Sequence, residues 1–305
     1  MKWEELWSLY RQHLLALARS QGTVWRRQWE MKRFFQFCQR RRLTLEKVTT
    51  QTIRDYDQEL REVPGGRGKI WNEISIVAAL RALLTFFDWA VEHRFMLLHP
   101  APDMTLRKPP PPPLKPLTTV DVLQILEAPD ASTPEGQRDR AILELIYSTG
   151  VRRRECHQLN LTDLDLVRRQ LAVHKGKGGR SRLLPVGEHL AEVMQDYLDR
   201  VRPLLRPLPG ESALFISSQN GRRLSLSSFW ARMQYACEAI GVKTGVHALR
   251  HAFASHLLEG GADVRHVQEM LGHSRVSTTQ RYTQLQPLEL IREHRHTHPR
   301  GRKKT

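Results

Sequence analysis

The sequence predicts a mainly helical (α+β) protein in which an N-terminal helical bundle precedes a mostly helical domain with one small antiparallel sheet. Three observations predict this architecture. Apolar residues in the N-terminal third recur with the helical period. A run of five prolines interrupts the chain at residues 109–113. Two short strand-like runs flank a glycine-rich, basic loop in the second half.

The N-terminal region is helical in character throughout. Met31, Phe34, Phe35 and Cys38 follow one another at i, i+3, i+4 and i+7, which builds one apolar stripe on a helix. Residues 74–93 predict another strong helix, and this one is apolar on most of its sides. We therefore expect that helix to lie at the centre of a small bundle.

The proline run divides the chain. Proline has no backbone N–H and its ring clashes with the preceding turn, so residues 109–113 cannot be helix interior or central strand. Consecutive prolines favour an extended polyproline stretch of about 3.1 Å per residue. We interpret residues 108–117 as a semi-rigid linker between a domain of residues 1–107 and a second domain of residues 118–305. The alternative is a long surface loop within one domain.

The second domain begins with helices, passes through a hairpin and returns to helices. Thr118 or Thr119 has the side chain of a helix N-cap. The further expected elements are a helix at 139–148 with an apolar face at Ile142, Leu145 and Ile146, strands at 170–174 and 182–186, a hairpin loop at 175–180, and helices from about residue 226.

The charge balance favours an anionic partner. Lys and Arg number 48 against 32 Asp and Glu, so the formal net charge is +16. Nucleic acid is the commonest partner of such a surplus. A basic ribosome-associated protein, or a merely soluble one, is the alternative on charge alone.

Other compositional signals exclude several classes of protein. Cys38, Cys156 and Cys237 are far apart and odd in number, so we expect neither a disulfide framework nor a zinc site, and a reducing, cytoplasmic compartment fits best. No stretch approaches the roughly 18–20 uncharged apolar residues of a membrane span. Residues 1–20 mix Glu, Arg and Trp with leucines, so we expect no signal peptide.

One face of the N-terminal helices carries a basic stripe. Arg26, Arg33 and Arg40 recur every seven residues, on a face other than the apolar one. Such a stripe contacts phosphate or is simply a solvated face, and the sequence leaves both interpretations open.

Five short motifs follow one another in the second half of the chain. They are STGVRRRE at 148–155, GKG at 176–178, HALRH at 247–251, LGH at 271–273 and TTQRYT at 278–283. In this order and spacing they resemble the tyrosine site-specific recombinases, or phage integrases, and most of all the Xer-type branch that resolves circular replicons. The N-terminal helices are similar to the family's core-binding domain, a SAM-like helical fold, so the resemblance covers nearly the whole chain.

The residue types agree with metal-free phosphodiester chemistry. Arg152 and Arg250 suit the neutralisation of phosphate oxygens, because a guanidinium binds phosphate bidentately and stays protonated. Tyr282 supplies a nucleophile that forms a covalent phosphotyrosine. His247 is placed as general base toward Tyr282. As an alternative, either arginine is a salt-bridge partner.

The resemblance implies roles for the remaining motif residues. Lys177 is the family's candidate general acid for the 5′-hydroxyl leaving group, although Lys175 is a near neighbour, and His273 donates a hydrogen bond to the phosphate. Glu155 holds Arg152 or an adjacent backbone group, and His251 is a supporting structural residue.

The chain departs from the family pattern in its first motif. Arg154 stands where the family usually has a small polar residue, and Cys156 stands where it usually has leucine. Arg153 and Arg154 therefore bind extra phosphate or require a local acid such as Asp163 or Asp165.

The resemblance further implies the reaction and its partners. A 3′-phosphotyrosine and a Holliday junction link two rounds of strand exchange, with no metal and no other cofactor. The partners are a double-stranded DNA site and a homo-tetramer, or a hetero-tetramer with a second recombinase, in the cytoplasm at the nucleoid and without a membrane. The task is replicon-dimer resolution or mobile-element integration and excision. A type IB topoisomerase and a DNA-binding regulator are the alternatives.

The C-terminal tail predicts a helix at residues 288–295. In the family such a tail docks into the neighbouring protomer, and the resemblance implies the same here. His294, His296 and His298 alternate, a pattern that also suits metal binding. Residues 300–304 form a basic end that contacts DNA or solvent.

Overall fold

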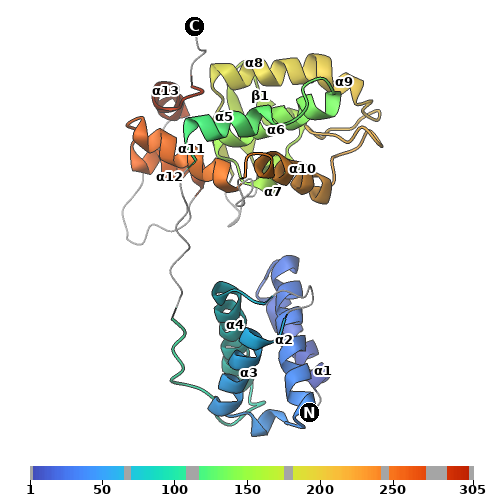
Figure 1. Ribbon diagram of the computed structural model, residues 1–305, viewed down its shortest axis with the longest axis vertical. Helices are drawn as coiled ribbons and strands as arrows, with labels where there is room; N and C mark the ends of the chain where they lie inside the picture. The colour runs from blue at the N-terminus through green and yellow to red at the C-terminus, as the bar shows by residue number, and fades with distance from the viewer. Residues whose placement is uncertain are drawn as a thin grey trace. The chain divides into compact units, whose positions relative to one another are not determined.

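The chain folds into two compact units, Met1–Leu114 and Lys115–Thr305. The computed structural model, shown in Figure 1, describes residues 3–64, 70–107, 117–174, 181–241, 247–272 and 287–301. The point of division lies in the proline-rich segment. Most of the expected linker, residues 108–116, falls outside the described residues.

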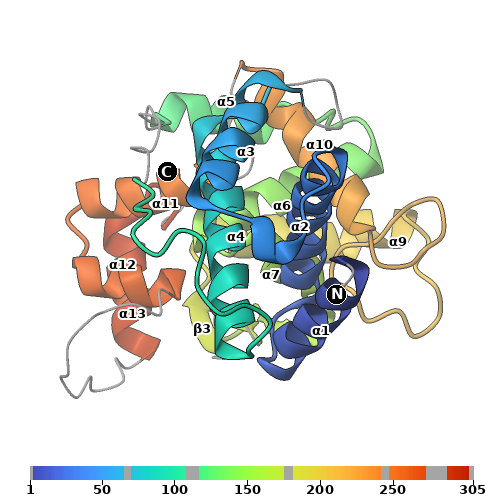
Figure 2. The ribbon, with the colours of Figure 1, turned by 90° about the horizontal axis from the view of Figure 1, so that it is seen from below.

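The first unit is a small helical bundle. Its described elements are α1 (Trp3–Ala16), α2 (Gln21–Arg40), the short 3-10 helix η1 (Leu45–Lys47), α3 (Thr50–Glu62) and α4 (Glu73–Glu92). The predicted stripe of Met31, Phe34, Phe35 and Cys38 is buried along α2, which confirms it. In Figure 2, α2 and α4 lie next to each other. Aromatic rings from α1, α2, α3 and α4 contact one another in the core of this unit.

Helix α4 is the apolar centre of this bundle. By length and composition it would suit a membrane span, which departs from the expectation that no segment approaches one. More than half of its apolar window is nevertheless buried inside the unit, and Arg81 and Asp88 interrupt it. Burial on most of its turns is the pattern of a core helix, as the sequence predicts.

The second unit is mostly helical with a three-stranded sheet. Its described elements are α5 (Thr119–Glu127), α6 (Pro134–Thr149), α7 (Arg153–Gln158), η2 (Leu161–Asp163), β1 (Leu164–Asp165), β2 (Gln170–Val173), β3 (Arg182–Pro185), α8 (Glu188–Asp196), the π-helical turn η3 (Tyr197–Val201), α9 (Arg202–Leu204), α10 (Leu226–Glu238), α11 (His247–Glu259), α12 (Val264–Leu271) and α13 (Pro287–Thr297).

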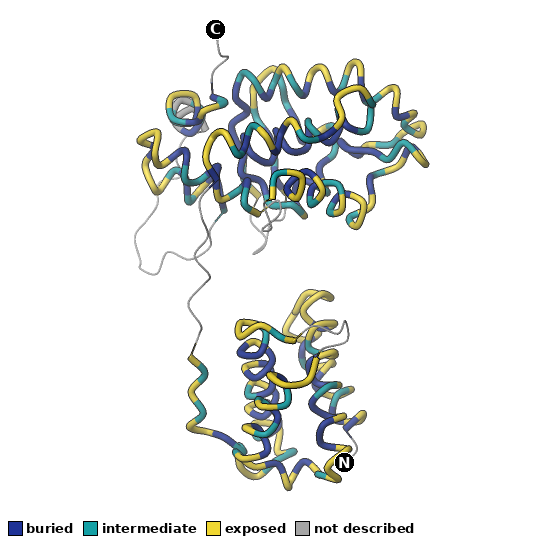
Figure 3. The backbone as a smooth tube through the Cα atoms, in the orientation of Figure 1, coloured by how far each residue is buried: buried dark blue, intermediate teal, exposed yellow. Residues whose placement is uncertain are grey.

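Helix α6 is the central element of the second unit. It is buried along nearly its whole length, as Figure 3 shows, because α5, α8, α10 and α11 pack around it. Thr133 caps its start and Pro134 fits the first turn, where no N–H is needed. The helix ends at Gly150, which is left-handed at φ +63°.

The sheet is antiparallel throughout, in the order β1-β2-β3. Leu171 faces Leu184 across β2 and β3, and both side chains are buried. Both predicted strands form, each ending a residue earlier than expected. The sequence analysis missed β1, because two residues are too few to show alternation.

The predicted cap at Thr118 also agrees with the structure. Thr118 is the N-cap of α5 and forms a capping box with Asp121. Cys38, Cys156 and Cys237 are free, buried thiols.

Replacing Phe34 by alanine will destabilise the first unit by about 3–5 kcal/mol. The ring is fully buried, and it meets the rings of Tyr56 and Phe87 edge to face at 5.1 and 5.8 Å. Urea unfolding followed by tryptophan fluorescence measures the loss. Leu97→Ala is the control, because this side chain is 96% exposed and its loss will change the unfolding free energy by less than about 0.5 kcal/mol. Equal effects of the two substitutions would contradict the packing described.

Candidate active site

Two arginines from separate sequence motifs meet at the C-terminal end of α12. We call the last three carbonyl groups there, those of Met270, Leu271 and Gly272, the α12 carbonyl end. Arg250 on α11 donates to Leu271, and Arg152, just before α7, donates to Gly272 at 2.9 Å. A third arginine, Arg182 on β3, donates to Met270 at 2.9 Å. The α12 carbonyl end therefore holds three guanidinium groups together.

The helix end supplies the attraction that this cationic cluster needs. The last carbonyls of an α-helix have no partner within the helix and carry the negative end of its dipole. Gly272 is left-handed at φ +61°, which ends the helix at this point. Arg152 and Arg250 each use two of their five N–H donors in bonds to described residues, so further donors remain for an anion.

Glu155 is the anionic partner of the cluster. Its carboxylate accepts from the Arg152 backbone N–H at 2.9 Å and from the Arg152 guanidinium at 2.8 Å. Both alternatives for Glu155 in the sequence analysis therefore occur together. It also accepts two bonds from Arg182, at 2.8 and 3.1 Å. Burial raises the pKa of Glu155, but the hydrogen bonds from Arg182 and Arg152 outweigh burial and lower the pKa to about 2.

The surroundings of Arg250 destabilise its charge. Burial and the nearby positive charge of Arg152 lower the pKa of Arg250 to about 10, and Glu155 offsets part of this effect. The guanidinium remains protonated at neutral pH. An anion bound between the two arginines would relieve their repulsion, which is the electrostatic preference of a phosphate site.

Gly150 fixes the second anchor of Arg250. Its carbonyl accepts a hydrogen bond from the Arg250 guanidinium. A Cβ at this position would lie 2.4 Å from the Phe253 ring, and the backbone is left-handed, so only glycine fits.

His247 opens α11, one helical turn before Arg250. The residue is exposed to solvent. Partial burial, followed by the positive charges of Arg153 and Arg250 and by His251, lowers the pKa of His247. The lowered pKa favours the neutral ring, the form that accepts a proton. His251 lies one turn further along and is exposed.

Arg153 and Arg154, the two extra arginines of the first motif, lie in different surroundings. Arg153 lies over the ring of Trp230, with its guanidinium carbon 4.1 Å from the ring centroid. Arg154 is exposed. The acids considered as partners pair elsewhere, because Asp163 contacts His174 at 3.1 Å and Asp165 contacts Arg168 at 3.6 Å.

Four of the residues singled out by sequence cannot be placed. Lys175, Lys177, His273 and Tyr282 lie outside the described residues. The sequence analysis in turn missed Arg182 and Trp230. Arg182 lies five residues after Lys177, at the start of β3. An arginine at the start of a short strand with buried residues was the feature of the sequence that could have pointed to it.

The basic stripe on α2 divides into bound and exposed members. Arg33 donates to the Val63 carbonyl at 3.2 Å and lies 4.9 Å from the centroid of the Trp71 ring. Arg40 forms an ion pair with Glu59 on α3. Arg26 is exposed.

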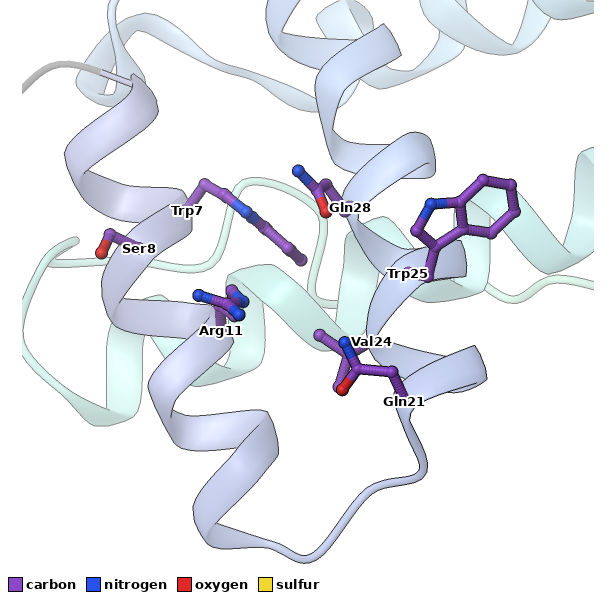
Figure 4. A pocket seen from close by; sticks show the side chains of 7 residues that line it. All are labelled: Trp7, Ser8, Arg11, Gln21, Val24, Trp25 and Gln28. Carbon is purple, nitrogen blue, oxygen red and sulfur yellow. The ribbon is translucent and has the colours of Figure 1, made fainter.

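A shallow pocket lies between α1 and α2, far along the chain from the arginine cluster. Figure 4 shows Trp7 projecting from α1 toward α2, while Trp25 lies on the outer side of α2. The remaining lining residues are Ser8, Arg11, Gln21, Val24 and Gln28. The pocket is amphipathic, with a single cationic side chain in its lining.

The C-terminal helix α13 packs on its own unit, against β3 and α11. His294 bonds to the Ser148 carbonyl at 2.7 Å and stacks on His298 at 4.7 Å. Burial lowers the pKa of His294 to about 4. Among the described residues no three His, Cys, Asp or Glu side chains are grouped to hold a metal ion, so the alternating histidines do not form such a group.

The comparisons with known proteins decide the family. Residues 115–289, more than half of the chain, match the model of the phage integrase family. The chain belongs to the phage integrase family. It is 38% identical over 287 residues to the tyrosine recombinase XerD of Mycobacterium tuberculosis, and the match covers 90% of each protein. It is 37% identical over 290 residues to the tyrosine recombinase XerC 2 of Ralstonia nicotianae, covering 94% of this chain and 83% of the relative.

Solved integrases share the fold. A lambda integrase fragment, solved as a dimer bound to a core site, superimposes with a TM-score of 0.69 at 21% identity, covering 94% of this chain and all of the fragment. The Tn1549 transposon integrase superimposes with a TM-score of 0.69 at 19% identity, and the match covers 89% of this chain and 92% of the transposon integrase chain. The predicted fold class is confirmed.

The family and its relatives also establish the activity. This integrase-family protein is a tyrosine recombinase, an enzyme that breaks and rejoins DNA at specific sites. The predictions of family and enzyme class are confirmed.

Replacing Gly150 by alanine will lower the unfolding free energy by about 2–5 kcal/mol, from left-handed strain and a clash with Phe253. It will also displace an anchor of Arg250. Gly210→Ala is the matched control, because Gly210 is left-handed at φ +77° with open space around it, so only the left-handed strain of about 1–2 kcal/mol applies. Thermal unfolding of both variants measures the difference. Equal losses would show that the Phe253 contact has no role.

Proposed function

We propose that Tyr282 attacks the scissile phosphate while Arg152 and Arg250 bind its non-bridging oxygens. The attack forms a 3′-phosphotyrosine and releases a 5′-hydroxyl, so one phosphoester replaces another and no energy input is needed. The 5′-hydroxyl of a partner strand then attacks this link and releases Tyr282. The convergence of Arg152 and Arg250 on the α12 carbonyl end is the observation that carries the proposal.

The two arginines stabilise the charge that develops in the transition state. Their anchored guanidinium groups are already oriented, so little reorganisation accompanies the reaction. Glu155 supports Arg152 through two hydrogen bonds. His273, which directly follows the α12 carbonyl end in the sequence, donates a further hydrogen bond to the phosphate.

Proton transfer is assigned to His247 and Lys177. The lowered pKa of His247 suits a general base that takes the phenolic proton of Tyr282 at neutral pH. Lys177 is the general acid that protonates the leaving 5′-oxygen. His251 has a supporting role beside His247.

Duplex binding is assigned to cations on both units. Residues 1–107 form the core-binding domain and residues 118–305 the catalytic domain. The candidate DNA contacts are Arg26, Arg33, Arg40, Arg153, Arg154 and Lys175. The exposed side chains of Arg26 and Arg154 fit direct phosphate contact, whereas Arg33 and Arg40 would have to exchange their present partners. Affinity will fall steeply with salt, because phosphate neutralisation releases counterions.

The assembly is a tetramer that holds two DNA sites and exchanges strands through a Holliday junction. A lambda integrase tetramer bound to a Holliday junction has the same fold, which supports this arrangement. Helix α13 is the candidate segment for docking into a neighbouring protomer, and to do so it would have to leave its present contacts with β3 and α11 of its own unit. The XerD and XerC relatives favour replicon-dimer resolution in the cytoplasm, by a homo-tetramer or with a second recombinase, over mobile-element integration and excision.

Covalent trapping tests this function. The full chain is incubated with nicked duplexes from its own replicon in the presence of EDTA, and adducts that resist SDS are counted. We expect an adduct with wild type and none with Tyr282→Phe, which removes only the nucleophilic oxygen. Sequencing the trapped DNA identifies the site. An adduct that persists in Tyr282→Phe would overturn the assignment of the nucleophile.

The pH dependence of trapping tests His247. The base must be neutral, so the rate falls as the pH drops through the His247 pKa, and the lowered pKa places this limb below the ordinary value of about 6.5. Removing the charge of Arg153 raises that pKa, so Arg153→Gln will shift the limb to higher pH. Arg154→Gln is the control and will leave the limb in place. Single-turnover rates at saturating DNA measure both, and equal limbs in all three proteins would contradict the role of Arg153.

A further inference from the structure

Arg182 contacts both the anionic partner Glu155 and the α12 carbonyl end, and it belongs to none of the five motifs. Its Nη1 and Nη2 atoms donate to the two carboxylate oxygens of Glu155 at 3.1 and 2.8 Å. Its Nε donates to the Met270 carbonyl at 2.9 Å. All three nitrogen atoms of the guanidinium therefore donate hydrogen bonds, two to Glu155 at the start of α7 and one to Met270 at the end of α12.

The ion pair between Arg182 and Glu155 is largely buried. The Arg182 side chain is 11% exposed and that of Glu155 is 6% exposed. A buried ion pair is weakly screened by solvent, but removing its charges from water costs free energy. Removing one partner therefore leaves the other as an uncompensated buried charge. The stem and guanidinium of Arg182 also lie 3.3 Å from where a Cβ on Gly272 would stand, so they pack against the turn that ends α12.

We propose that Arg182 is a positioning residue for DNA cleavage, which orients Arg152 through Glu155 and holds the α12 carbonyl end in place. Arg182 donates to the same two carboxylate oxygens of Glu155 that accept hydrogen bonds from Arg152, so it fixes the plane of the carboxylate on which Arg152 depends. It also bridges β3 to the end of α12. The inference rests on the proposed function, in which Arg152 and Arg250 bind the scissile phosphate.

Lysine cannot reproduce this geometry. An ammonium group is a point charge with three donors, whereas the planar guanidinium addresses a carboxylate and a carbonyl in one fixed arrangement. Loss of Arg182 therefore frees the carboxylate to turn and lets the α12 carbonyl end shift. A displacement of about 1 Å in a positioning element costs on the order of 100-fold in rate.

The test is single-turnover adduct formation by the full chain on a nicked duplex. Arg182→Met will slow the step on the order of 100-fold and Arg182→Lys roughly tenfold, while duplex affinity stays unchanged because the side chain is buried. Arg169→Met is the matched control. Arg169 lies beside β2, pairs with Glu188 at 3.1 Å, and will leave the rate unchanged.

Two further readouts separate positioning from general support of the fold. Without Arg182 the pKa of Glu155 rises, so the rate of Arg182→Met relative to wild type will fall further as the pH is lowered. The double variant Arg182→Met/Glu155→Gln will lose less rate than the two single losses combined, because in Glu155→Gln only the contact of Arg182 with the α12 carbonyl end remains to be lost. The double variant will also lose this extra pH dependence. The double variant and Arg182→Lys also carry the test if Arg182→Met does not fold.

The outcomes are distinguishable. A wild-type protein without a Tyr282-dependent adduct would overturn the proposed function. With an active wild type, a normal rate in Arg182→Met would overturn the role of Arg182 alone. A loss that is independent of pH and adds in full to that of Glu155→Gln would overturn it as well.

Discussion

The attraction between three guanidinium groups and the C-terminal end of one short helix is the constraint on which the rest of the second unit depends. Arg152, Arg182 and Arg250 come from three distant segments, and like charges so close together repel. The α12 carbonyl end and Glu155 supply the compensating negative charge. The surrounding core of α6 and α11 fixes the backbone from which these side chains reach the helix end.

This arrangement joins stability and function in the same contacts. The bonds that satisfy the last carbonyls of α12 also fix the orientation of the arginines before any substrate binds. Pre-orientation matters in a reaction with a tyrosine nucleophile, since the protein must supply the charge that stabilises the transition state. The residual repulsion between Arg152 and Arg250 then favours an anion over an empty site.

The first motif shows how neighbouring residues divide this work. Arg152 turns toward the α12 carbonyl end, Arg153 turns toward Trp230 and influences His247, and Arg154 is exposed. The sequence motif singles out Arg152 but leaves the partners of Arg153 and Arg154 open. The direction of each side chain follows from the start of α7 at Arg153 and from what packs around it.

The sequence by itself determined the elements and the chemistry. The apolar stripe on α2, the cap at Thr118, the two longer strands and the family motifs are local or ordered patterns, and the structure and comparisons agree with them. Tertiary structure decided which side chains meet. Arg182, Trp230 and the backbone carbonyls of Gly150 and Met270–Gly272 carry no motif, since a carbonyl is present at every residue and becomes an acceptor for arginine only when a helix ends beside it.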